Sequence, residues 1–206
     1  MNRRSMLISM RLAFGILTLV AIVAQLRVHM RGGFDVVNFF SYFTNLSNLF
    51  AAAMMLTAAG HQMRGRELSP VLESVRGASV VAMVVVGVVF SVLLRKADLG
   101  ALMPWVNSTL HYIMPVVTAL DWIIQPPKNR LSLRNAGTWA IFPLAYLAYT
   151  LARGAAVGWY PYPFLNPANV GGYGGVALYA IAIVVVFSVA SWILIAVAAG
   201  RRRKTI

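Results

Sequence analysis

The sequence has no cysteine, only five acidic residues and only 11% charged residues among its 206 positions. Without cysteine the chain has no disulfide, no zinc–thiolate site and no thiol nucleophile. Soluble domains carry about 25% charged residues, so the shortage of charge disfavours a soluble enzyme, an extended nucleic-acid-binding protein and a disordered chain. The basic excess, a formal net charge of +13, therefore does not by itself indicate a nucleic-acid partner.

Hydrophobic residues are present in excess, at 60% of the chain, and the mean hydropathy is +0.74. A chain this short has a high surface-to-volume ratio and cannot bury so much apolar surface in a single core. The composition therefore predicts an integral membrane protein.

Apolar segments long enough to cross about 30 Å of hydrocarbon occur six times. They cover residues 6–26, 36–59, 75–94, 105–125, 137–151 and 174–200. The joints between them are short and polar. We therefore expect an all-α, multi-pass protein in which residues 1–206 form a single six-helix transmembrane domain.

The basic residues give an orientation because Lys and Arg accumulate on the cytoplasmic side of a membrane. With the N-terminus inside, five basic residues are exterior and twelve are interior. The exterior set is Arg27, Arg31, Arg95, Lys96 and Arg153, and the interior set is Arg3, Arg4, Arg64, Arg66, Arg76, Lys128, Arg130, Arg134, Arg201, Arg202, Arg203 and Lys204. This asymmetry predicts cytoplasmic termini, with Arg201–Lys204 as an anchor at anionic lipid heads.

The second segment carries an unusual set of polar residues. At 100° per residue, Asn38, Ser41, Thr44, Asn45 and Asn48 share about a third of one continuous helix face. Such a stripe must face protein or water rather than lipid. One interpretation is that these side chains only join helices. The other is that they form a reactive site.

The fourth segment supplies a partner for that site. His111 is the one histidine well inside a segment, with Asn107 on the same face and Pro115 loosening the helix after it. Thr44 and His111 are expected about 13 Å and 10 Å from the exterior ends of their helices, at similar depth. A Thr hydroxyl needs a base to become a nucleophile, and neutral imidazole is such a base. His111 as an ordinary hydrogen-bonding side chain is the alternative.

The remaining polar residues receive secondary roles. Asn45, Asn48, Asn107 and Ser41 are candidates to stabilise an oxyanion or orient the imidazole. Arg11 and Asp121 both fall toward the interior ends of their segments and predict a structural ion pair. Too few His and carboxylate residues accompany them for a metal site, and we expect no cofactor.

An aromatic, Pro-rich loop precedes the last segment and contains Tyr162, Pro163 and Phe164. One explanation is an interfacial aromatic belt. The functional interpretation is a stiff cover over the outer mouth of the site, with Tyr42 and Tyr112 as further pocket residues.

These features together resemble the androgen-induced and androgen-dependent TFPI-regulating family of six-helix membrane threonine hydrolases, in a prokaryotic form. The resemblance rests on Thr44 within the run Tyr42–Asn48, on Asn107 four residues before His111, and on Tyr162–Leu165. It implies a bacterial plasma membrane protein that hydrolyses fatty acid esters of hydroxy fatty acids, with Thr44 as nucleophile and His111 as base. The implied partners are a lipid ester and membrane lipids, with no nucleic acid.

Three functions are therefore open at the level of sequence. The first is an intramembrane lipid esterase. The second is a small transporter, and this hypothesis predicts polar groups through the full depth of the bundle. The third is a non-catalytic lipid-binding protein, and this hypothesis predicts the same pocket without a Thr44–His111 contact.

Overall fold

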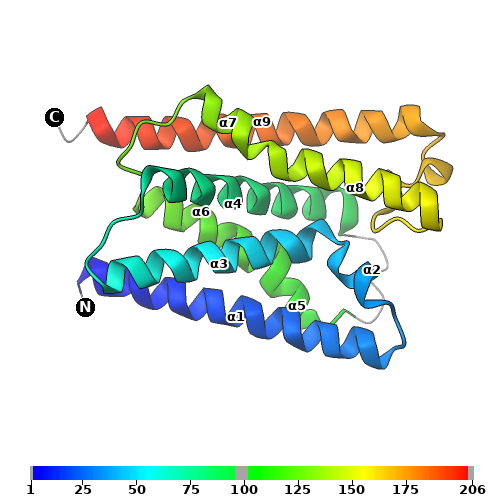
Figure 1. Ribbon diagram of the computed structural model, residues 1–206, viewed down its shortest axis with the longest axis horizontal. Helices are drawn as coiled ribbons and strands as arrows, with labels where there is room; N and C mark the ends of the chain where they lie inside the picture. Colours follow the sequence, from blue (N-terminus) through cyan, green and yellow to red (C-terminus); the bar gives the residue numbers. More distant parts are fainter. Residues whose placement is uncertain (1, 96–101, 204–206) are drawn as a thin grey trace.

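The computed structural model describes residues 2–95 and 102–203, and all regular structure in these ranges is helical. The helices form long passes that run side by side (Figure 1). In chain order the passes are α1 (Arg3–Arg31), α2 (Val36–Phe40) with α3 (Phe43–Met63), α4 (Pro70–Val89) with the π-helical turn η1 (Phe90–Leu94), α5 (Pro104–Ser108) with the π-helical turn η2 (Thr109–Ile113) and α6 (Met114–Ile124), α7 (Leu133–Trp139) with α8 (Ile141–Val157), and α9 (Tyr173–Arg203).

The helix α4 is the centre of the bundle. It packs against α3, α6, α7 and α9, and Val81 and Met83 on it are completely buried. The helices α1 and α3 pack together on one side of α4, while α8 and α9 lie on the opposite side (Figure 1). The two short 3₁₀ turns η3 (Pro163–Leu165) and η4 (Pro167–Asn169) connect α8 to α9.

Four helical stretches are long and apolar enough to cross a membrane. They are Arg3–Arg31, Pro70–Leu94, Leu133–Val157 and Tyr173–Gly200. The structure is thus all-helical and consistent with an integral membrane protein, as the composition predicts. The passes that contain α3 and α6 are not among these four stretches.

Two of the expected segments are not continuous helices. The segment predicted at 36–59 breaks after Phe40, and Tyr42 adopts an extended conformation at φ −78° and ψ 125°. The carbonyl of Ser41, left without a helical partner, accepts a hydrogen bond from the Tyr146 hydroxyl at 2.9 Å. The prediction that Asn38 and Ser41 continue the helix face of Thr44 is therefore wrong. The segment predicted at 137–151 extends over Leu133–Val157 and is interrupted at Ala140, three residues before Pro143.

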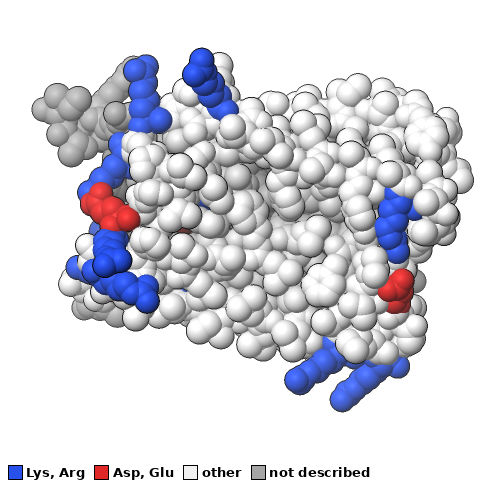
Figure 2. Space-filling view, viewed as in Figure 1, with Lys and Arg blue, Asp and Glu red and all other residues white. Residues whose placement is uncertain are grey.

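Charged side chains gather at the two ends of the molecule and leave an uncharged band between them (Figure 2). Arg4 hydrogen-bonds the Gln62 carbonyl and Lys128 pairs with Glu67, so the helix ends around the N-terminus share one end. Lys96 and Lys204 lie outside the described residues.

A buried ion cluster joins α1, α4 and α6. The expected pair is present, with Arg11 Nε 2.7 Å from Asp121 Oδ1. The other carboxylate oxygen lies 2.9 Å from Arg76 Nη1. Arg76, one of the interior basic residues counted from the sequence, belongs to this buried cluster, because its side chain is only 3% exposed and also contacts Glu73. One carboxylate therefore bridges guanidinium groups from two helices.

Replacing Asp121 by Asn should strongly destabilise the fold, because it leaves two buried guanidinium groups without their shared counter-charge. We expect a loss of about 3–5 kcal/mol in the free energy of unfolding, measured by denaturation in detergent micelles. Glu67→Gln makes the same chemical change in the exposed pair with Lys128 and should cost less than about 1 kcal/mol. Equal effects of the two substitutions would show that the buried cluster does not stabilise the bundle.

Candidate functional site at the end of an apolar cavity

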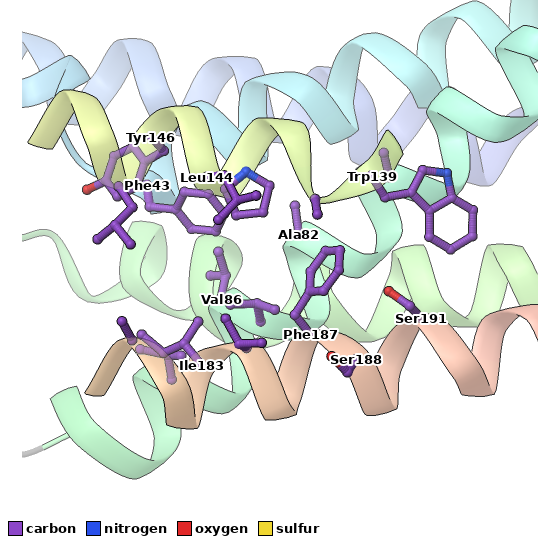
Figure 3. A pocket seen from close by; sticks show the side chains of 18 of the residues that line it. Phe43, Ala82, Val86, Trp139, Leu144, Tyr146, Ile183, Phe187, Ser188 and Ser191 are labelled. Atoms are coloured by element: carbon purple, nitrogen blue, oxygen red, sulfur yellow. The ribbon is translucent and has the colours of Figure 1, made fainter. Parts of the chain in front are cut away.

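A cavity of about 450 Å³ lies between α4, α8 and α9. Its walls are apolar side chains such as Val86, Leu144 and Phe187 (Figure 3). No Lys, Arg, His, Asp or Glu of the described residues lines it. The helices α8 and α9 do not pack closely on each other along this length, so the cavity separates them. Its volume and lining are typical of a site for an apolar ligand.

Thr44 lies at one end of this cavity, where α3 begins. Because it is the second residue of α3, its backbone N–H has no carbonyl partner inside the helix. The N–H donates to the Tyr162 hydroxyl oxygen at 3.2 Å, and Thr44 Oγ1 lies 3.3 Å from the same oxygen. The break at Tyr42 therefore places a hydroxyl and an N–H at the polar end of an apolar cavity.

The Tyr162 side chain reaches this position from the loop between α8 and α9. Its ring stacks on Phe164 with the centroids 5.2 Å apart, and Tyr42 packs edge-on against it. Burial raises the pKa of Tyr162 to about 12, so the phenol stays protonated at physiological pH. Gly154 helps to seat the loop, because a Cβ atom there would lie 2.0 Å from the Tyr160 ring. Tyr162 is thus a fixed neutral group that donates and accepts hydrogen bonds.

His111 lies in the π-helical turn η2. Pro115 has no N–H to offer the His111 carbonyl, which favours the wider turn at this point. Gly87 on α4 admits the proline, since a Cβ atom there would lie 2.9 Å from Pro115 Cβ. The imidazole stacks on Phe90 of η1, with the ring centroids 3.8 Å apart. The irregular turns of two passes therefore meet at the histidine.

The hydrogen bond of His111 favours one tautomer. Nδ1 lies 3.2 Å from the Asn107 carbonyl oxygen, which only accepts, so Nδ1 carries the proton in this arrangement. Nε2 is then unprotonated, and no hydrogen bond to it is present in the described part of the chain. A general base requires such an unprotonated nitrogen, so this neutral tautomer could accept a proton at Nε2.

Asn48 connects the two candidate residues. Its amide nitrogen donates to the Thr44 carbonyl at 2.9 Å and to the Leu110 carbonyl at 3.1 Å. Leu110 directly precedes His111, so one fully buried side chain fixes the backbone of α3 against that of η2. Asn45 holds the helix break instead, because its amide donates to the Phe39 carbonyl at 2.8 Å.

The structure brings only part of the predicted set to the cavity. Thr44, Tyr162 and Phe164 line it, whereas Pro163 lines a separate pocket of about 210 Å³. Tyr42 and Tyr112 do not line the cavity. Tyr42 packs edge-on against the Tyr162 ring, and Tyr112, which is 42% exposed, packs edge-on against Phe90. Ser41 bonds the Val37 carbonyl and the Tyr149 hydroxyl on the other side of the break.

Thr44 and His111 are not hydrogen-bonded to each other in the described structure. His111 is also absent from the cavity lining, although Phe90, which covers one face of its ring, is part of that lining. The partner of the Thr44 hydroxyl is Tyr162. The Asn107 side-chain oxygen is buried and has no hydrogen-bond partner in the described part of the chain.

Three residues of this region were not predicted from the sequence. Tyr146 and Phe90 shape the cavity near Thr44, and Ser191 lines its other end. No local pattern distinguishes them from the other apolar and small residues of their helices. Within the described residues, no group of three or more His, Asp or Glu side chains lies close enough to hold a metal ion.

Comparison of the chain with protein-family models, with curated proteins and with solved structures gave no match.

The role of Asn48 can be tested by its removal. Asn48→Ala leaves the Thr44 and Leu110 carbonyls without their shared donor, and we expect a loss of about 1–3 kcal/mol in the free energy of unfolding. Ser47→Ala is the matched control, because the neighbouring Ser47 hydroxyl is equally buried and has no hydrogen-bond partner. Chemical denaturation in micelles measures both. A loss for Ser47→Ala as large as for Asn48→Ala would contradict the proposed bridge.

Proposed function

We propose that this protein is an intramembrane hydrolase of long-chain acyl esters, with Thr44 as its nucleophile. The observation that carries the proposal is the position of the Thr44 hydroxyl at the polar end of an apolar cavity of about 450 Å³. An acyl chain fills the apolar length, and its ester group then lies beside Thr44. The resemblance to the family of membrane threonine hydrolases supports the same chemistry and favours esters of hydroxy fatty acids.

In the proposed reaction Thr44 Oγ1 attacks the ester carbonyl carbon while His111 Nε2 takes the hydroxyl proton. The tetrahedral intermediate expels the alcohol, which receives that proton from His111. Water, deprotonated by the same nitrogen, then cleaves the acyl–threonine ester and releases the fatty acid. Each proton that the imidazole accepts is returned to a leaving oxygen, so the enzyme is regenerated.

This reaction requires one rearrangement of the site. Thr44 Oγ1 has to leave Tyr162 and turn toward His111, and hydrogen bonds between catalytic groups often form only once substrate is bound. When the hydroxyl leaves, the Tyr162 O–H and the Thr44 N–H both become available to an incoming carbonyl oxygen. We propose these two donors as the oxyanion site.

The asparagines then serve to position the site. The amide nitrogens of Asn45 and Asn48 are occupied by backbone carbonyls. They hold the helix break and the two backbones rather than the oxyanion. The main-chain carbonyl of Asn107 holds the imidazole.

The membrane setting of the proposal is a bacterial plasma membrane crossed by all six passes, with both termini in the cytoplasm. Support comes from the exposed basic residues Arg3, Arg4, Arg64 and Arg66 at the end that holds the N-terminus. In this orientation Thr44 and His111 lie in the outer half of the membrane. The gap between α8 and α9 would admit the ester laterally from the outer leaflet.

A second function, lipid binding without chemistry, is favoured by one observation. The Thr44 hydroxyl is paired with Tyr162 and not with His111, an arrangement that holds a polar head group equally well. Transport finds less support, because no charged side chain of the described residues lines the cavity.

Hydrolysis of a long-chain p-nitrophenyl ester by the purified protein decides between the first two functions. We expect turnover by the native protein, and Thr44→Ala and His111→Ala should each lower kcat at least a thousandfold, as for other nucleophile–base pairs (on the order of 10³ or more). Tyr162→Phe should lower kcat about a hundredfold with little change in KM if its hydroxyl binds the oxyanion.

Thr118→Ala is the control, because Thr118 is equally buried, bonds only within α6 and does not line the cavity. Its activity should equal that of the native protein. Retention of a bound acyl ester without any turnover would identify the protein as a lipid-binding protein. Full activity of Thr44→Ala would refute the assignment of the nucleophile.

A further inference from the structure

The end of the cavity remote from Thr44 holds a polar group that the proposed reaction does not use. Ser191 on α9 lines the cavity, and only 1% of its surface is exposed. Figure 3 shows its side chain directed into the cavity, at the opposite end from Tyr146. Its Oγ atom has no hydrogen-bond partner among the described residues.

Ser47, Thr150 and Ser191 all have buried hydroxyls without a hydrogen-bond partner among the described residues, and of these three only Ser191 lines the cavity. A buried Ser or Thr in a helix commonly donates to the carbonyl four residues earlier. Thr18, Thr109 and Thr118 all do so here, at 2.8–2.9 Å. The Ser191 hydroxyl instead faces the cavity, and leaving a buried hydroxyl unpaired is unfavourable. A ligand bound in the cavity would supply the missing hydrogen-bond partner of the Ser191 hydroxyl.

The position of Ser191 along α9 indicates which part of a bound ligand contacts its hydroxyl. Tyr162 bonds Thr44 and stacks on Phe164, which in turn packs against Tyr179 of α9. Ser191 is twelve residues beyond Tyr179, or about 18 Å along the helix axis. A group that bonds Ser191 therefore belongs to the distal part of an extended acyl chain and not to its ester end.

The charge of the lining limits the chemistry of that group. No cationic side chain among the described residues lines the cavity, and a buried carboxylate without a counter-charge is strongly disfavoured. A hydroxyl both donates and accepts hydrogen bonds. The fitting partner is therefore an uncharged oxygen, such as a hydroxyl or a keto group.

We infer that the cavity selects acyl chains that carry an uncharged oxygen on their distal half, through a hydrogen bond to Ser191. This inference rests on the proposed use of the cavity as the acyl-chain site and adds a specificity-determining residue to it. The ester end remains at Thr44, so the same ligand is held at two polar points separated by apolar walls.

A competition experiment tests the inference without any turnover. Thr44→Ala protein in detergent micelles is incubated with equimolar methyl stearate and methyl 12-hydroxystearate and re-isolated, and the retained esters are quantified by mass spectrometry. We expect the hydroxylated ester to be enriched about five- to tenfold, the effect of one buried hydrogen bond. Methyl 3-hydroxystearate, whose hydroxyl lies near the ester, should show no enrichment.

Adding Ser191→Ala should abolish the enrichment and leave retention of methyl stearate unchanged, which also shows that the variant folds. The matched control is Ser79→Ala, which removes an equally buried hydroxyl that bonds Arg76 and does not line the cavity. It should keep the enrichment. Equal retention of both esters by the protein with Ser191 would overturn the inference alone. Retention of neither ester above empty micelles would refute the acyl-chain site and with it the proposed function.

Discussion

The candidate site depends on the requirement that backbone carbonyls inside a membrane find donors within the protein. The passes through α3 and η2 face each other at Thr44 and Leu110. The Asn48 amide satisfies the carbonyls of both residues at once. Because the same side chain bonds both backbones, it also fixes how far Thr44 is from the residue that precedes His111. A hydrogen bond required for stability thus sets the geometry on which the proposed chemistry relies.

Irregular backbone occurs where this site is built. The break at Ser41–Tyr42 makes Thr44 the second residue of a helix and leaves its N–H for Tyr162. The π-helical turn before Pro115 turns His111 onto Phe90, and Gly87 makes room for the proline ring. Each irregularity is compensated by a tertiary contact, since Tyr146 caps the Ser41 carbonyl. Two regular helices would present neither the free N–H of Thr44 nor the π-helical turn that holds the imidazole.

The two halves of the bundle have different roles. On the side of α1, α3 and α6, the Asp121 ion cluster and the Asn48 amide join neighbouring passes. On the side of α8 and α9 the helices stand apart and enclose apolar space. Tyr162 connects the two sides, because its loop leaves α8 and its hydroxyl ends on α3. In the proposed function, the first side positions the reactive groups and the second accommodates the acyl chain.

The sequence by itself determined the membrane character of the chain, its helical class and the Arg11–Asp121 pair, because apolar excess and isolated intramembrane charges have few physical solutions. It also singled out Thr44 and Tyr162, since a polar run and an aromatic loop are rare in such a chain. The Thr44–Tyr162 contact, the entry of Arg76 into the ion cluster and the unpaired Ser191 hydroxyl were decided by the tertiary structure alone. These features depend on which side chains meet across helices distant in sequence, and on where the backbone leaves its regular path, and no local periodicity encodes either.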